Sequence, residues 1–325
     1  MPTRNQHVVA QMHLRHWADE NDQVFAYLIP EKKSLITSPR NICAQRDYYE
    51  MNAPVDLPFT IDEMLADDIE GPAAAPLAKL ATLDVSDISA DERESLCYYF
   101  GFQAVRTPVS HEQMNKLALK DHRDRALSIL SDKKKFREFE IDWKAENPGK
   151  GLPSREELLN TLDPSSGITW KVEGNDHNLK LMAMIGPLMK GEYSKRRWTL
   201  LVAPSGRQFI CSDNPLVTTT GYTTCGPITE TVIPIGPRST LLMEKSYQFD
   251  GISVAIVDHR IVREVNKRVA FHAGRFVVTA NQRLLNRVLK TREENSKVIE
   301  EIKTRNLGEI IKSSNLRSIG QMLSR

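Results

Sequence analysis

The stretch FICSDNPL at residues 209–216 is typical of a β-strand that runs into a polar tip carrying an aspartate. Strand-favouring residues also occupy Trp198–Val202, and a Ser-Gly pair between the two segments is typical of a tight turn, so we predict a β-hairpin. Pro215 cannot donate a hydrogen bond to a sheet and keeps the residue before it out of helical geometry. The strand should therefore end at Asp213.

Asp213 has two interpretations. A carboxylate at a strand end can serve catalysis or bind a metal ion. Asp and Asn before Pro are also common turn formers whose side chains cap their own backbone. Both interpretations stay open at this point.

The fold class follows from the remaining pattern. Residues 23–29 and 34–37 alternate as two strands of a second hairpin. Capping boxes at Ser89–Glu92 and Ser154–Glu157 predict helix starts, and apolar residues at helical spacing predict long helices over 111–130 and 178–189, the latter buried on several sides. We therefore expect an α+β protein, mostly helical, with a small antiparallel sheet built from hairpins.

The C-terminal half adds strands and a tail. Residues 233–237 and 240–243 predict two further strands, and the proline within the first, Pro234, favours a sheet edge. No linker is obvious before a charged, helix-prone tail. We expect one domain over residues 1–280 and a helical C-terminal extension over 281–325, whose helices could bind a protein partner.

The composition is that of an ordinary folded protein. The 325 residues are 40% hydrophobic and 26% charged, and 44 basic against 42 acidic residues leave a net charge of +2, which indicates no polyanionic partner by itself. We expect a cytoplasmic protein without membrane contact, because no signal peptide or membrane-length apolar run is present. Reduced thiols are expected at the four widely spaced cysteines Cys43, Cys97, Cys211 and Cys225.

Arg106 lies at the end of a helix that starts near Ser89, on the same stripe as apolar residues. An arginine in such a place pairs with a buried carboxylate or binds an anionic ligand. Glu70, just before the helix break at Gly71-Pro72, and Asp213 are the candidate partners.

Several segments, taken in order, resemble a known family. They are the histidine-bearing start through Leu14-Arg15-His16-Trp17, Pro39–Ala44 with Tyr48-Tyr49, Ile69-Glu70, Arg106-Thr107-Pro108 and residues 209–215. Together they resemble a bacterial family catalogued as domain of unknown function 4238, up to about Asn281. The resemblance implies no particular reaction, but it favours a role for Glu70 and Asp213.

Two functions fit these residues. In the first, the protein is a metal-assisted hydrolase, nuclease-like, in a toxin or defence setting. His7, Glu70 and Asp213 would hold a divalent metal ion, and Arg106 would complete the catalytic set by stabilising phosphate charge on a nucleic acid. In the second, it is a non-catalytic binding or regulatory module in which the same four residues form a buried structural network.

Overall fold

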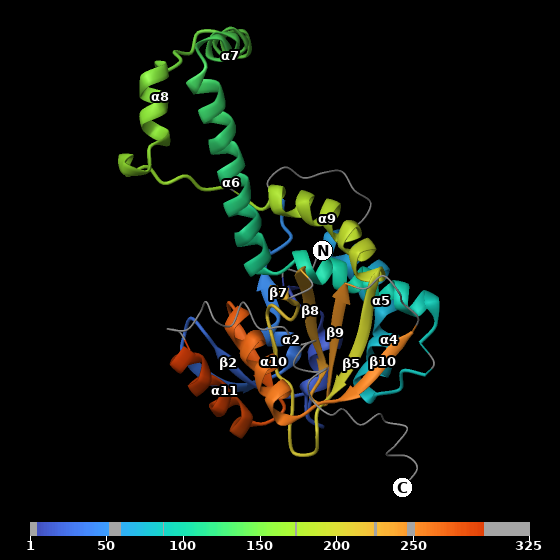
Figure 1. Ribbon diagram of the computed structural model, residues 1–325. Helices are drawn as coiled ribbons and strands as arrows, with labels where there is room; N and C mark the ends of the chain where they lie inside the picture. Colours follow the sequence, from blue (N-terminus) through green and yellow to red (C-terminus); the bar gives the residue numbers. More distant parts are fainter. Residues whose placement is uncertain are drawn as a thin grey trace. The chain divides into compact units, whose positions relative to one another are not determined.

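Helices and strands follow one another without a regular βαβ order, so the fold is α+β, as expected (Figure 1). The computed structural model describes residues 5–51, 60–86, 88–172, 174–223, 226–245 and 251–295. The chain forms two compact units. One comprises the chain up to Ser110 and from Asn175 onward, and the other comprises His111–Gly174.

Within the described residues, eleven strands and fourteen helical segments are present. The strands are β1 (Asn5–His7), β2 (Val24–Leu28), β3 (Lys33–Thr37), β4 (Ala44–Arg46), β5 (Arg196–Val202), β6 (Cys211–Ser212), β7 (Val217–Thr223), β8 (Gly226–Gly236), β9 (Ser239–Lys245), β10 (Ile252–Ile256) and β11 (Phe276–Thr279). The helical segments are α1 (Gln11–Leu14), the 3-10 turn η1 (Arg15–Trp17), α2 (Pro39–Ile42), α3 (Ile61–Met64), the π-helix η2 (Leu65–Glu70), α4 (Gly71–Thr82), α5 (Ala90–Val105), α6 (Pro108–Ser131), α7 (Lys133–Glu146), α8 (Arg155–Leu162), the 3-10 turn η3 (Pro164–Ser166), α9 (Asp176–Ser194), α10 (His259–His272) and α11 (Gln282–Asn295).

The sheets of the first unit are larger than expected. A five-stranded sheet has the order β10-β5-β9-β8-β7, a four-stranded sheet has the order β3-β2-β11-β6, and β1 pairs with β4. Strands β10 and β5 run parallel, whereas the other neighbours are antiparallel. The prediction of a small, purely antiparallel sheet was therefore wrong in size and in one pairing.

The predicted hairpin between Trp198–Val202 and Phe209–Ile210 is not formed. Strand β5 pairs with β9 and β10, while β6 pairs with β11 in the four-stranded sheet. The chain between them bonds instead to the turn after β8, since the Ala203 N–H donates to the Arg238 carbonyl (2.9 Å) and the Phe209 N–H to the Pro237 carbonyl (2.8 Å). Each of the two segments thus pairs with a strand distant in sequence and not with the other segment. Strand β6 does end at Ser212, directly before Asp213.

Pro234 lies in an inner strand and not at a sheet edge. Pairing of β8 with β7 stops at Val217–Val232, before the proline, and the register with β9 shifts between Pro234 and Gly236. A bulge is the other place where a sheet tolerates proline. The Pro234 carbonyl in this bulge accepts a hydrogen bond from the His13 side chain.

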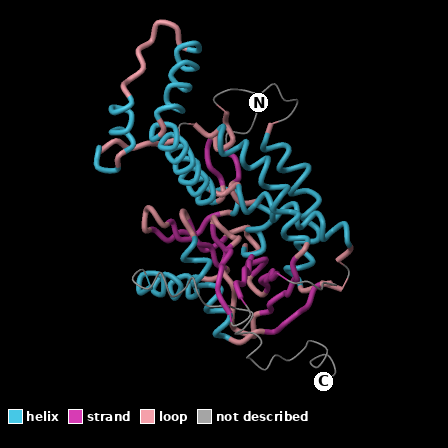
Figure 2. Tube along the Cα trace, turned by 45° about the horizontal axis from the view of Figure 1, so that its top comes forward, coloured by secondary structure: helices cyan, strands magenta, loops and turns pink. Residues whose placement is uncertain are grey.

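Alternate residues of the large sheet face two hydrophobic cores. On β5 and β9, Leu200 and Leu241 belong to one core with α4, α5 and α9, whereas Leu201 and Leu242 belong to the other with α10 and α11. This is the period of two expected for a strand that is buried on both faces. The strands accordingly lie between helices on two sides (Figure 2).

Several local predictions are confirmed. Strands β2 and β3 form the expected antiparallel hairpin, and the capping boxes at Ser89 and Ser154 both have the two reciprocal hydrogen bonds. Cys43, Cys97 and Cys211 are buried free thiols, while the Cys225 prediction lies outside the described residues. In the part of the chain that is described, no helix is long and apolar enough to cross a membrane.

Helix α9 is less buried than its apolar sequence predicts. Met184 and Leu188 are 67% and 69% exposed, so the prediction that several faces are buried was wrong. The helix packs on α5 through glycines, and a Cβ added to Gly101 would come within 2.4 Å of the Gly186 carbonyl oxygen. Small residues at this crossing let the two backbones approach closely.

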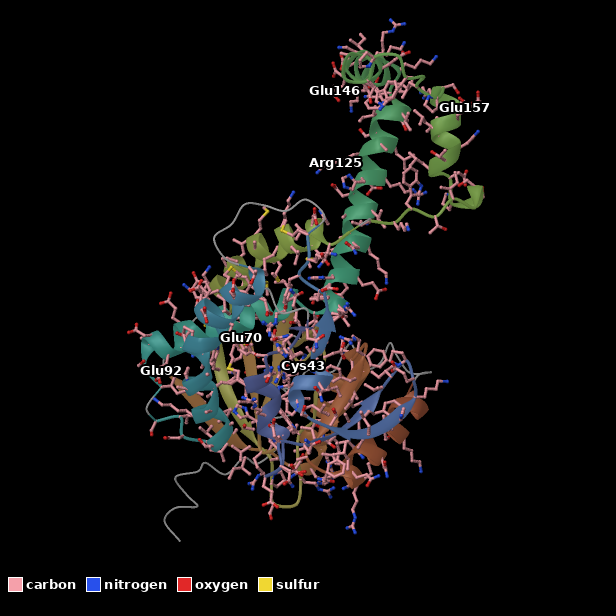
Figure 3. The ribbon with its side chains drawn as sticks, turned by 180° about the vertical axis from the view of Figure 1, so that it is seen from behind. Cys43, Glu70, Glu92, Arg125, Glu146 and Glu157 are labelled. Atoms are coloured by element: carbon pink, nitrogen blue, oxygen red, sulfur yellow. The ribbon has the colours of Figure 1, made fainter. Side chains whose placement is uncertain are left out.

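The expected boundary between residues 280 and 281 lies within the first unit and stays a prediction. Helix α11 packs on α10, β11 and β2, and its Leu285 and Val288 are buried in the second core. Residues 111–174 instead form the separate unit, which contains α7, α8 and most of α6. Its charged side chains, such as Arg125, Glu146 and Glu157, are exposed (Figure 3).

Candidate functional site: a polar pocket beside a buried ion pair

Arg106 caps the C-terminus of α5 and pairs with Glu70. Its side chain is 1% exposed, and its Nη1 donates to Glu70 Oε1 at 2.7 Å while its Nε donates to Gln103 Oε1 at 3.0 Å. Burial is the largest single effect and lowers the Arg106 pKa, but the Glu70 carboxylate together with Tyr49 and Tyr99 outweighs it, so the pKa lies above its ordinary value. Of the two partners expected from the sequence, the structure selects Glu70.

Side chains on one face of α5 extend this pair into a network. Gln103 Nε2 donates to the Val8 carbonyl at 3.1 Å, and Tyr99 donates its hydroxyl proton to His13 Nδ1 at 2.8 Å. His13 Nε2 in turn donates to the Pro234 carbonyl at 2.6 Å. The network therefore connects α5 to the end of β1, to α1 and to the bulge in β8.

His13 is fully buried in this network, and burial lowers its pKa from 6.5 to about 3, although the hydrogen bond to Pro234 opposes the shift. The folded protein holds the imidazole neutral, whereas the unfolded chain protonates it below pH 6.5. Stability contributed by neutral His13 is thus present above pH 6.5 and is lost as the pH falls toward 3.

We expect the free energy of unfolding to fall between pH 6.5 and pH 5 by about 2 kcal/mol through His13 alone, since one pKa unit corresponds to about 1.4 kcal/mol. Urea unfolding of wild type and His13→Gln at both pH values measures this. The variant should be less stable at pH 7 but should depend less on pH. Equal pH dependence in the two proteins would contradict the assignment.

Glu70 reaches Arg106 from a π-helix. The segment η2 follows α3, which begins at a capping box on Thr60, and ends at Glu70 where α4 begins. A π-helix bonds residue i to i+5, so its wider turn shifts the side chains that follow relative to an α-helix. Glu70 lies in the same part of the first unit as Cys43 (Figure 3). Burial raises the Cys43 pKa, Arg106 lowers it and Glu70 raises it.

Within the described residues, Asp213 is bonded to backbone amides and not to Arg106. Its side chain is fully buried, with Oδ1 accepting from the backbone N–H groups of Gly274 at 3.0 Å and Phe276 at 3.2 Å. Burial raises the Asp213 pKa, although these backbone donors oppose it. Asp213 therefore anchors the turn between α10 and β11. Its side chain accepts from backbone amides, as in the turn-former interpretation, but these amides belong to a distant segment and not to its own turn.

His7 borders a pocket of about 590 Å³ in the first unit. The lining residues are Asn5, His7, Gln11, Arg15, Arg40, Asn41, Ala44 and Asp62. They come from β1, α1, η1, α2, β4 and α3, all within the first 62 residues. Two arginines, three amide side chains, one histidine and one aspartate provide hydrogen-bonding groups in the wall.

Hydrogen bonds order one side of the pocket. Gln11 Nε2 donates to His7 Nε2 at 2.8 Å, and Arg15 Nη2 donates to Gln11 Oε1 at 3.3 Å. Tyr49 donates its hydroxyl proton to the His7 carbonyl at 2.9 Å. Burial lowers the His7 pKa, with Arg106 and Arg40 acting in the same direction and Asp62 and Glu70 against it. His7 is therefore a neutral base at pH 7.

Three of the four predicted site residues interact electrostatically, namely His7, Glu70 and Arg106, whereas the Asp213 carboxylate accepts from backbone amides. Among the described residues, no group of three or more His, Cys, Asp or Glu side chains is arranged to hold a metal ion. The expected ligand set of His7, Glu70 and Asp213 is thus not assembled, because the Asp213 carboxylate is bonded to backbone amides.

Sequence reasoning missed the pocket arginines. Arg15 and Arg40 were present in the segments that carry the family resemblance, but both are exposed residues of short helices, with no periodicity that distinguishes them from ordinary surface charges. The position of Arg15 and Arg40 in those segments was the one sequence feature that could have indicated a role in a site.

The fold and site thus define an α+β protein with a polar pocket set against a buried ion pair. The chain belongs to the family described as "Protein of unknown function (DUF4238)", whose model matches residues 5–283. The matched range contains the whole pocket and the Arg106 network. Comparison with curated proteins found no match, and the search of solved structures found none either.

Proposed function

We propose that the protein is a binding module for a small anionic ligand, which occupies the pocket bordered by His7, Arg15 and Arg40. The observation that carries the proposal is the pairing of two accessible guanidinium groups with amide side chains around one cavity. Guanidinium groups bind carboxylate and phosphate oxygens through two parallel hydrogen bonds. A volume of about 590 Å³ suits a ligand of metabolite or nucleotide size.

The two arginines are available to a ligand. Arg40 is exposed and has no ion-pair partner within the described residues. Arg15 lies 3.7 Å from Asp22, but both side chains are half exposed, at 56% and 50%, and such pairs contribute little. An oxyanion can therefore compete for Arg15 at small cost.

The buried network supports the pocket from behind. Gln103 holds the Val8 carbonyl next to His7, and His13 anchors α1, which carries Gln11, to β8. Preformed walls reduce the ordering that a ligand must bring about. This use of Arg106 and Glu70 favours the binding-module hypothesis over the metal-assisted hydrolase, because Asp213 and Arg106 both have structural partners. Cleavage of nucleic acid, which the hydrolase hypothesis requires, is measured in the test below.

Calorimetric titration with pyrophosphate tests the proposal. We expect Arg15→Gln and Arg40→Gln each to weaken binding about tenfold or more, as loss of a charge-assisted hydrogen bond implies. Arg123→Gln, an exposed arginine of α6 outside the pocket, is the matched control and should bind as wild type does. The proposal is wrong if wild type does not bind pyrophosphate, or if both pocket variants bind it unchanged. Mg²⁺-dependent cleavage of RNA or DNA by wild type, lost in Asp213→Asn, would favour the hydrolase instead.

A further inference from the structure

The neighbours of Gln11 determine which end of its side-chain amide is the oxygen and which is the nitrogen. Oε1 accepts from Arg15 Nη2 and Nε2 donates to His7 Nε2. Rotating the amide by half a turn would set its NH₂ group against the Arg15 guanidinium, donor against donor. While Arg15 bonds to Gln11, the Nε2 atom of His7 is therefore an acceptor, and the ring carries its hydrogen on Nδ1.

Charged groups from four elements face the His7 ring. They are Asp62 on α3, Glu70 on η2, Arg106 at the end of α5 and Arg40 on α2. Burial has the largest effect on the state of the ring and favours the neutral form, the two carboxylates oppose it, and the two guanidinium groups act with it. One further negative charge in the pocket would shift this balance toward the imidazolium form.

A bound oxyanion changes both the orientation of the Gln11 amide and the charge around His7. By taking the Arg15 guanidinium, it releases Gln11 Oε1, and the amide is free to turn and accept a hydrogen bond from His7. Its own charge lies in the cavity that His7 borders. Both changes favour a second hydrogen on the imidazole, which is then a donor to the ligand or to Gln11.

We propose that the pocket binds doubly charged oxyanions, such as a terminal phosphate group, with uptake of one proton from solvent at His7 through the His7–Gln11–Arg15 chain of hydrogen bonds. This rests on the proposed function, because it requires the anion to occupy the same pocket. A phosphodiester carries one charge and one fewer unsubstituted oxygen, so it benefits less from a cationic His7. His7 is thus a specificity-determining residue for the number of charges on the ligand.

Nuclear magnetic resonance of the full chain labelled with ¹³C-histidine tests the proton uptake. Sulfate is the probe, since it stays doubly charged throughout the pH range of the titration. We expect saturating sulfate to raise the His7 pKa by about two to three units, as an opposite charge at close range does. His7→Gln identifies the signal, and the exposed His122 is the internal reference, which sulfate should not affect. In Gln11→Met, the sulfate-induced rise should be clearly smaller.

Phenyl phosphate and its methyl diester test the ligand class at pH 7. Wild type should prefer the monoester by about tenfold, as one charge-assisted hydrogen bond implies, and His7→Gln should lose most of this preference. Binding of sulfate or of the monoester without any change in the His7 titration overturns the inference and leaves the anion pocket standing. Absence of binding by wild type overturns the pocket and the inference together.

Discussion

Arg106→Met should lower the free energy of unfolding by about 3–5 kcal/mol, the cost of leaving one partner of a buried ion pair alone. Glu70 is only 21% exposed, so its carboxylate cannot recover full hydration when the guanidinium is removed. The same change releases Gln103 Oε1 and weakens the support of the Val8 carbonyl. Urea unfolding monitored by circular dichroism measures the difference.

Arg125→Met is the matched control for Arg106→Met. Arg125 also pairs with a carboxylate, that of Asp121, at 2.8 Å, but the two side chains are 74% and 55% exposed. We expect a cost below about 1 kcal/mol for this pair. In the double variant of Arg106→Met with Glu70→Gln, part of the stability should return, since no buried charge is then left unpaired. A cost for Arg106→Met no larger than that of the control would contradict the role of Arg106 as the hub of the network.

Asp213→Ala should cost about 3 kcal/mol. The substitution leaves the N–H groups of Gly274 and Phe276 without their acceptor in a buried setting, and each such group costs about 1–3 kcal/mol. Asp213→Asn retains an Oδ1 atom at the same place, so it should cost much less. Amide hydrogen exchange at Phe276 should be faster in the alanine variant and near wild type in the asparagine variant. Equal stability of the two variants would show that the anchoring interpretation is incorrect.

Local features of the fold were predictable, and pairings over long distances were not. Ser89 and Glu92 are three residues apart, so their capping box depends only on neighbours and formed as expected. The partners of Trp198–Val202 lie some forty and fifty residues further along the chain, in β9 and β10, and a nearby Ser-Gly turn suggested a closer one. Sheet pairing is decided by which apolar faces meet in three dimensions, which a single chain does not display.

The candidate site was predictable to a similar degree. Arg106 on an apolar stripe indicated a buried carboxylate partner, and Glu70 is that partner. The partners of Asp213 are backbone amides, which every residue but proline has, so no sequence pattern identifies them. Arg268 was missed for a related reason. It lies on α10 near the charged residues Arg263, Glu264 and Lys267, yet it is fully buried and donates to Glu230 at 2.6 Å.

The anchoring of α1 to distant strands has a consequence for how the chain is made. His13 bonds to a carbonyl 221 residues later, His16 to one 219 residues later, and Trp17 to one 192 residues later. At a synthesis rate of about 5–20 residues per second, the N-terminal segment waits roughly ten to forty seconds on the ribosome before its partners emerge. The residues that line the pocket are encoded first, whereas the strand that anchors α1 is made late, so a nascent chain exposes its histidines and Trp17 until β8 has been translated.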